Sequence, residues 1–427
     1  MLLRRALLTL LVLACLQGAA RAQESPSPEG GPPAEEVPAE APAPPDAPAP
    51  ADAPAPADAP APPGENGSLE LQVGIYQNDD NGDGNPFLDE QETVIEPVVV
   101  FSLNVREDLT VTLTGSYDFV SSASIDRLSN YPEQSGASGD FYYGGDLALR
   151  WRATDALTLG VHGGYSTEYD YRSIALGGDV SLDLFQRNTT LSLGVNAFLD
   201  TVRVIRFDGS EEGDEGRTSF TVNLGLYQVL TPTVHMSLGY SLTLQDGFLE
   251  TPFNAVVLED PSDPPNTALD NLARGVEITE ELPDTRLRHA LYGQLRKYFS
   301  TGTALSVGGR FYADDWGILS ATLELGVHQW LIQDVLRARL RYRYYVQTAA
   351  DAFDRRLFVP PAQRANFVAT RERTQDSDLG DFDAHAVGLQ FTWRIVPGHQ
   401  LTLGGEYVLR SDGIDQIVGL LAYRIEF

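Results

Sequence analysis

The residues whose spacing most directly suggests chemistry lie in an acidic stretch at positions 79–90. This stretch reads DDNGDGNPFLDE and matches the twelve-residue loop that holds calcium in helix–loop–helix motifs, with Gly84 at the sharp turn. The predicted calcium ligands are Asp79, Asn81, Asp83, the carbonyl of Asn85, and Glu90. The flanking segments have the pattern of strands instead of helices. An acidic surface turn without calcium is therefore the alternative interpretation.

A second group of candidate residues is a run of arginines at every other position. From 337 to 343 each odd residue is Arg, whereas Leu340, Tyr342 and Tyr344 occupy the other parity. Because neighbouring side chains of a strand point to opposite faces, the guanidinium groups share one face. Charged residues keep to this polar parity in other predicted strands as well. The predicted lumen-lining residues are Asp118, Asp146, Glu168, Asp179, Asp183 and Asp200 in the first half, and Arg286, Arg288, Arg310, Arg337, Arg339, Arg341 and Arg343 in the second.

Two interpretations of these opposite charges are open at this point. Guanidinium groups are costly inside a protein unless they are hydrated or paired with carboxylates. If the two sets pair across the interior, they plug it and the protein has a structural or surface-interaction role. If they stay hydrated, they line a polar channel with a transverse field for charged solutes.

Other chemistry finds little support in the sequence. The six histidines are scattered without metal-ligand spacing, and no GxSxG motif occurs, so the chain is predicted not to be an enzyme. An outer-membrane hydrolase that assembles its residues from neighbouring strands stays as a third alternative. The formal net charge of −30 argues against nucleic acid as a partner. The only cysteine is Cys15, which excludes a disulfide or a cysteine-ligated metal in the rest of the chain.

The elements that must position these residues are strands, and the last of them is the most regular. Tyr423, Ile425 and Phe427 share one parity, and Arg424 and Glu426 take the other. This alternation predicts a strand with one apolar and one polar face. A C-terminal Phe after alternating Ile and Tyr resembles the closing strand of bacterial outer-membrane barrels, which the barrel assembly machinery reads as a signal. An ordinary edge strand of a soluble sheet is the alternative.

From Leu69 onward the chain is predicted to be a regular meander of about sixteen such strands. Alternating segments of about 9–14 residues are joined by connections that are short and long in turn, with long ones at 78–93, 120–140, 207–216, 247–284 and 350–382. An even strand number with short turns on one side predicts a closed, antiparallel, up-and-down transmembrane β-barrel of the all-β class. A soluble sandwich or solenoid would not produce this asymmetry.

The N-terminal segments are predicted to direct export. Arg4 and Arg5 precede an apolar run that ends near Ala20-Arg21-Ala22, so residues 1–22 read as a cleaved signal peptide, with lipidation at Cys15 as a minor alternative. Residues 23–66 are rich in Pro, Ala, Asp and Glu and predict a disordered periplasmic tether. The tether is either an inert spacer or a ligand for periplasmic components. Residues 67–427 form the predicted barrel.

Several motifs of the barrel region resemble a family of uncharacterised outer-membrane β-barrels of Gram-negative bacteria, catalogued as a domain of unknown function. The motifs are Asp79–Pro97, Ser121–Ser124, Leu282–Arg286, Tyr312–Ile318 and Arg343–Gln347. The resemblance implies a barrel in contact with outer-membrane lipid, and it implies no substrate or activity. With the charged parity, the sequence predicts a passive channel or uptake pore for small polar or charged solutes, and a possible calcium ion in the first extracellular loop.

Overall fold

The computed structural model describes residues 66–79, 90–124, 140–262 and 276–427, all within the compact unit Ala39–Phe427. The predicted signal peptide, the predicted tether up to residue 65, and the predicted ligands Asn81, Asp83 and Asn85 lie outside the described residues.

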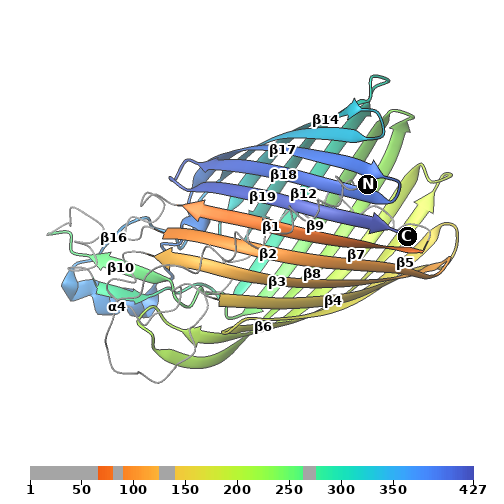
Figure 1. Ribbon diagram of the computed structural model, residues 1–427. Helices are drawn as coiled ribbons and strands as arrows, with labels where there is room; N and C mark the ends of the chain where they lie inside the picture. The colour runs from red at the N-terminus through yellow and green to blue at the C-terminus, as the bar shows by residue number, and fades with distance from the viewer. Residues whose placement is uncertain (1–65, 80–89, 125–139, 263–275) are drawn as a thin grey trace, which may run out of the picture. The chain divides into compact units, whose positions relative to one another are not determined.

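Sixteen antiparallel strands form a closed barrel, which confirms the predicted fold class (Figure 1). Each strand pairs with the next barrel strand along the chain, and β1 closes the ring against β19. The barrel strands are β1 (Gly67–Asp79), β2 (Glu90–Arg106), β3 (Leu109–Ser124), β4 (Asp140–Arg152), β5 (Leu157–Thr167), β6 (Tyr171–Leu184), β7 (Thr189–Ile205), β8 (Glu211–Thr231), β9 (Val234–Gly247), β12 (Thr285–Tyr298), β13 (Thr303–Asp314), β14 (Leu319–Ile332), β15 (Leu336–Gln347), β17 (Phe382–Val396), β18 (His399–Arg410) and β19 (Asp415–Glu426).

The outward face of the barrel is apolar, as the alternation of the sequence predicts. Leu71 and Ile75 of β1 are 46% and 48% exposed, although they would be buried in a soluble sheet. Exposed aromatic residues lie near both ends of the strands, as in the girdles of transmembrane barrels: Tyr143, Tyr165 and Tyr407 near one end, and Trp151, Trp393 and Phe427 near the other. A bilayer would cover this surface.

The last strand closes the barrel through its terminal residue. The carbonyl oxygen of Phe427 accepts hydrogen bonds from the amides of Asn66 and Gly67, at 2.8 and 2.9 Å. Its ring stacks on Phe101, with 6.4 Å between the ring centroids. The residues Tyr423, Ile425 and Phe427 therefore belong to the seam between the first and last strands, where an unpaired edge would otherwise remain.

The two ends of the barrel differ in their connections. One end, here called the turn end, carries short turns such as Glu107–Asp108 and Gly398. The other end, the loop end, carries the longer connections, and Figure 1 shows β10, β16 and α4 grouped there, away from the C-terminus.

Two of the predicted loops contain secondary structure of their own. The β9–β12 connection forms β10 (Ala255–Glu259) and β11 (Val276–Thr279), and the β15–β17 connection forms β16 (Leu357–Phe358). These three strands make a small sheet in the order β11-β10-β16. The second connection also forms η1 (Pro361–Gln363), α4 (Arg364–Thr370) and η2 (Ser377–Leu379). We call the described parts of these two connections, 248–262, 276–284 and 348–381, the paired loops.

The expected loop at 207–216 is shorter than predicted, because β8 begins at Glu211. Arg203 pairs with Glu211 at 2.8 Å and Arg172 with Asp214 at 3.1 Å, so ion pairs stabilise this charged extension of the β7–β8 hairpin. Within the described ranges, no helix is long and apolar enough to cross a membrane.

Candidate functional site: a lumen with two charged walls

The arginine run lies on β15 and faces the lumen. Leu340 is 50% exposed on the outer face, so the alternate residues Arg337, Arg339, Arg341 and Arg343 point inward. In the closed ring of sixteen strands, β15 and β5 lie eight places apart, and the strands beside β5 are β4 and β6. The arginine ladder, as we call residues 337–343, therefore stands opposite β4–β6.

The ladder is paired with carboxylates of its own side of the barrel. Arg341 lies 3.0 Å from Glu324 of β14 and 3.7 Å from Glu406 of β18. Arg339 reaches Glu324 at 3.8 Å, and Arg343 reaches Glu406 at 3.7 Å. Two glutamates thus lie among three arginines. In these ion pairs the carboxylates come from β14 and β18, on the same side of the barrel, and not from the acidic residues of the opposite wall.

A glycine allows Glu406 to reach the ladder from two strands away. Arg341 is opposite Gly388 on β17, and Gly388 is opposite Glu406 on β18, so the three residues form one row across the sheet. A Cβ atom on Gly388 would lie 2.9 Å from Glu406 Oε2. Because Gly388 has no side chain, the glutamate can extend across this position toward the ladder.

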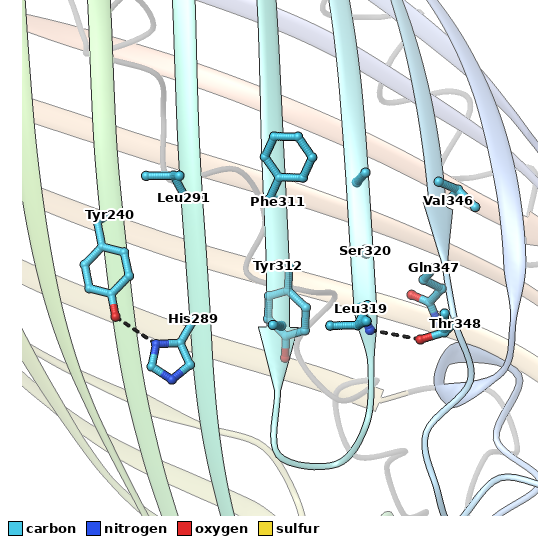
Figure 2. Close-up of a pocket in the computed structure, with 12 residues that line it drawn as sticks. Tyr240, His289, Leu291, Phe311, Tyr312, Leu319, Ser320, Val346, Gln347 and Thr348 are labelled. Atoms are coloured by element: carbon cyan, nitrogen blue, oxygen red, sulfur yellow. Dashed lines mark hydrogen bonds between the residues drawn. The ribbon is translucent and has the colours of Figure 1, made fainter.

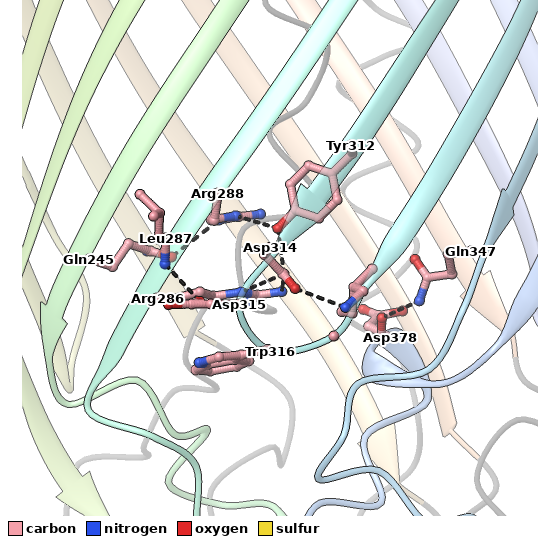
Figure 3. Close-up of polar contacts among 12 residues, drawn as sticks. Gln245, Arg286, Leu287, Arg288, Tyr312, Asp314, Asp315, Trp316, Gln347 and Asp378 are labelled. Carbon is pink, nitrogen blue, oxygen red and sulfur yellow. Dashed lines mark hydrogen bonds and ion pairs between the residues drawn. The ribbon is translucent and has the colours of Figure 1, made fainter.

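Further arginines of this wall are fixed near the loop end (Figure 3). Arg286 Nη2 donates to Asp314 at 2.7 Å, and its guanidinium group lies over the Trp316 ring at 4.2 Å from the centroid. Arg288 Nε donates to the Tyr312 hydroxyl at 2.9 Å, and that hydroxyl donates to Asp314 at 2.7 Å. Since Arg286 is buried, it supports this corner of the wall and does not line open water. Arg310 of β13, which pairs in register with Tyr292, also faces inward and lies farther from the loop end than Arg286.

The opposite wall carries acidic residues among small side chains. Asp146 of β4 and Asp179 of β6 face inward near the middle of their strands, and Asp118 of β3 faces inward closer to the loop end. Beside Asp146 the wall has a recess of about 180 Å³, lined by residues that include Thr114, Ser116, Tyr142, Ser166 and Phe198. This acidic wall is thus polar and hollowed at the depth of the ladder.

Three of the predicted acidic residues have other surroundings. Asp200 is buried, accepts a hydrogen bond from Ser173 at 2.7 Å and pairs with Arg217 at 2.9 Å. Asp183 lies at the turn end, where Thr190 donates to it at 2.6 Å. The prediction that Glu168 lies on a strand is wrong, because β5 ends at Thr167 and Glu168 begins the turn to β6. The physical reason is that this connection is tight, with the Glu168 amide bonded to the Tyr171 carbonyl at 2.7 Å.

Glycines on the inner face let long side chains lie flat along the wall. A Cβ atom on Gly177 would lie 2.3 Å from His162 Nε2, and one on Gly239 would lie 2.0 Å from the Tyr292 ring. The same holds for Gly160, where Asp179 occupies the space, and for Gly144, where Tyr142 does. His162, Tyr292 and Asp179 therefore fill the space above a glycine of the adjacent strand, and Tyr142 fills the space above a glycine of its own strand, so these side chains lie along the wall.

The paired loops cover the basic side of the loop end. Inward-facing Ala290 and Tyr312 are buried in one apolar cluster with Leu249, Leu282 and Leu379 of the loops. Arg410 of β18 pairs with Asp412 at 2.6 Å and also with Asp378, and it lies over the Phe382 ring. Gln347 Nε2 donates to the Asp378 carbonyl at 2.9 Å. The loops are thus fastened to the inner wall of β12–β18.

Inside the paired loops, buried charges are bonded to the backbone. Arg373 is 2% exposed and donates to the carbonyl oxygens of Thr279 at 2.9 Å and Val368 at 3.1 Å. Its burial lowers the pKa of Arg373. The buried carboxylate of Glu280 accepts from the Thr251 amide at 2.8 Å and from the Thr374 hydroxyl. These contacts tie the two loops to each other and indicate a structural role.

One cavity is a groove on the outer face (Figure 2). It has a volume of about 590 Å³ and is lined by outward residues of β9 to β15, among them Leu291, Phe311 and Leu319. Tyr240 of β9 and His289 of β12 lie at one side of the groove and are joined by a hydrogen bond of 2.7 Å. Because the groove opens to the apolar outer surface, it belongs to the membrane-facing side and not to the lumen.

Histidines pair with tyrosines at several places in the barrel. His385 bonds Tyr342 and His399 bonds Tyr423, each at 2.8 Å through Nδ1, as His289 does with Tyr240. These pairs join neighbouring strands near the two ends of the barrel. They give the alternative of a hydrolase no support.

The predicted calcium loop begins and ends on paired strands. Asp79 is the last residue of β1, Glu90 is the first of β2, and Asp79 pairs in register with Gln91. Among the residues that the structure describes, no group of three or more His, Cys, Asp or Glu side chains could hold a metal ion.

The set of predicted lumen-lining residues did not include Glu324, Glu406 and Arg410. The alternation of the sequence marks all three as inward-facing, so their orientation could have been predicted. What it could not supply was the strand register, which places Glu324 opposite Arg343 and brings Glu406 into the same row as Arg341.

The chain belongs to the family described as "Protein of unknown function (DUF3570)", whose model matches residues 139–424. This family is the outer-membrane barrel family that the sequence motifs resemble. No curated protein sequence matches the chain.

Solved structures of outer-membrane barrels resemble the chain over most of its length. OccK1 of Pseudomonas aeruginosa is 9% identical, with 85% of this chain and 99% of that chain covered and a TM-score of 0.40. A TodX monoaromatic hydrocarbon channel mutant is 10% identical, covering 86% and 91%, with a TM-score of 0.41. A bacterial polysaccharide outer membrane secretin is 9% identical, covering 84% and 98%, with a TM-score of 0.46. At these values we draw no functional argument from them.

Proposed function

We propose that the protein is an outer-membrane channel through which small charged or polar solutes pass passively. The observation that supports this most is the arginine ladder of β15, which faces the acidic wall of β4–β6 across a lumen whose long side chains lie along the walls. A sixteen-stranded barrel is wide enough to leave an aqueous channel.

Opposite charges on facing walls give each kind of solute its own route. At physiological ionic strength the field of a charge decays over about 8 Å, so a wall acts mainly on solutes close to it. Anions would therefore move along the ladder, and cations along Asp118, Asp146 and Asp179. The paired loops narrow the entrance on the basic side.

Conductance of the purified protein in planar bilayers tests the proposal. We expect the wild type to form open channels, and the change of Arg337 and Arg343 to Glu to move the reversal potential toward cation selectivity. The control changes Arg106 and Arg172 to Glu, since these are 60% and 57% exposed and lie outside the ladder. A folded, conducting ladder variant with an unchanged reversal potential would contradict the proposed route.

A plugged lumen is the alternative, and the paired loops favour it. They bury the inward faces of Ala290 and Tyr312, so part of the loop-end opening is filled. If the loops close the opening completely, the wild-type protein will not conduct although it is folded. The protein would then act as a structural or surface-interaction barrel.

The location and assembly of the protein form part of the same proposal. The apolar outer belt supports insertion in the outer membrane after export, with the tether in the periplasm and possible contacts there with periplasmic components. Tyr423, Ile425 and Phe427 would be read by the barrel assembly machinery. Deleting Phe427 should lower the yield of heat-modifiable barrel far more than deleting part of the tether.

We also propose that positions 79–90 bind calcium. The pairing of Asp79 with Gln91 places the two ends of this stretch side by side, as a shared cation requires. Calcium should raise the melting temperature of the wild type, and changing Asp79 and Glu90 to Ala should abolish that rise. If calorimetry detects no heat of calcium binding, the alternative interpretation holds, and the stretch is an acidic surface turn without calcium.

A further inference from the structure

The ion pairs that join the ladder to Glu324 and Glu406 are mostly long, and they are shared. Of the four distances that join Arg339, Arg341 and Arg343 to the two glutamates, one is 3.0 Å and the others are 3.7–3.8 Å. All five side chains keep between 18% and 31% of their surface exposed. Such pairs in contact with water exchange partners readily, because each is worth little by itself.

The glutamates also show which anion the ladder accommodates. A carboxylate matches the planar guanidinium fork in geometry, and both Glu324 and Glu406 lie between two arginines. Successive ladder residues are two positions apart on β15, which corresponds to about 6.6 Å along the strand. The carboxylates therefore occupy positions that a carboxylate solute would occupy as it passes.

We propose that Glu324 and Glu406 are resident counter-ions that a solute carboxylate displaces from one ladder arginine after another. This inference rests on the proposed channel function and names small carboxylates as the anions for which the ladder is suited. In the absence of solute, the glutamates compensate part of the positive charge of each arginine. They thereby determine which anions can bind there. A solute carboxylate then replaces an existing pair and leaves when the glutamate returns, so it is not trapped by an uncompensated charge.

The removal of the counter-ions tests this role. In the double variant E324Q/E406Q two negative charges beside the ladder are lost, so the ratio of anion to cation permeability should rise. We expect a rise of about threefold, because an ion pair in contact with water contributes only a small free energy. The conductance in sodium acetate should saturate at a lower acetate concentration than in the wild type, because acetate leaves the arginines more slowly. Unchanged selectivity and saturation in a folded, conducting variant would overturn the proposal.

Two further variants separate local exchange from total charge. E70Q/E426Q removes two carboxylates from Arg424, at 3.4 and 3.2 Å, and leaves the ladder intact, so its acetate saturation should match the wild type. Gly388→Ala keeps every charge, but its Cβ would lie 2.9 Å from Glu406 Oε2 and displace that carboxylate. It should shift saturation in the same direction as E406Q. If E70Q/E426Q acts as strongly as E324Q/E406Q, only net charge matters and the proposal fails.

A measurement without conductance distinguishes this inference from the channel proposal. Acetate should raise the melting temperature of detergent-solubilised E324Q/E406Q by occupying the vacated positions, and should leave the wild type and E70Q/E426Q unchanged. This result would support the counter-ion role even if the wild type does not conduct, in which case the channel proposal alone fails. If acetate does not stabilise E324Q/E406Q, the glutamates are fixed structural partners and the inference is wrong.

Discussion

The two walls of the lumen use the same inward-facing positions in different ways. On the basic wall, long arginine side chains bond to carboxylates of adjacent strands, and Arg410 also holds the paired loops. On the acidic wall, aspartates lie flat over glycines beside a recess of about 180 Å³. The basic wall is therefore covered and cross-linked, whereas the acidic wall is open.

This difference shows how a barrel combines a stable wall with a hydrated one. Guanidinium groups make several hydrogen bonds at once, so they can join a strand to a loop that crosses it. An aspartate is short and accepts bonds only from close neighbours. Changes on the basic wall should consequently affect stability and loop position, and changes on the acidic wall should affect solute selectivity alone.

The largest effect is expected from Arg410→Ala. Arg410 and Asp412 are both buried, and removal of the arginine leaves an unpaired buried carboxylate, which costs about 3–5 kcal/mol. The paired loops should detach from β17 and β18. We expect a lower melting temperature, proteolytic cleavage within residues 348–381, and a higher conductance.

Arg106→Ala is the matched control, because the pair of Arg106 with Asp108 is 60% and 41% exposed and should contribute about 0–1 kcal/mol. If Arg410→Ala and Arg106→Ala have equal protease resistance and conductance, the loops do not depend on the basic wall.

A smaller effect is expected on the acidic wall from the double variant D146N/D179N. Loss of two partly exposed lumen charges should shift the permeability ratio toward anions by about twofold, because water and salt screen such charges. The melting temperature should stay that of the wild type, since the wall is not cross-linked through these residues. D183N, at the turn end, serves as the control for charge outside the middle of the lumen. A marked loss of stability in D146N/D179N would contradict the contrast between the walls.

The barrel and the inward parity of its charges could be predicted from the sequence because a strand alternates strictly between its two faces. Sixteen strands, the ladder and most predicted lumen residues follow from that rule. The surroundings of Arg286 could not be predicted, since Asp314 and Trp316 approach it from another strand and turn. The small sheet β11-β10-β16 also escaped prediction, because its strands are two to five residues long and come from connections about 100 residues apart.

The smallest expected effect concerns the cover of the basic wall and its dependence on pH. Burial raises the pKa of Glu250 in the β9–β12 connection, and Arg206, 2.7 Å away, offsets part of this. A carboxyl group whose folded pKa exceeds its unfolded value of about 4.3 contributes stability that is fully present below that value and is lost as the pH rises through the folded pKa. The paired loops should therefore resist protease better at mildly acidic than at neutral pH. Glu250→Gln should remove this increment, because the amide mimics the protonated acid at every pH. Glu281→Gln, at a side chain 54% exposed in the same connection, should retain most of the increment, because the charge of Glu281 raises the pKa of Glu250 less than burial does. If Glu250→Gln keeps the wild-type pH profile, Glu250 does not control how firmly the loops cover the basic wall, and the acid dependence must come from other carboxylates.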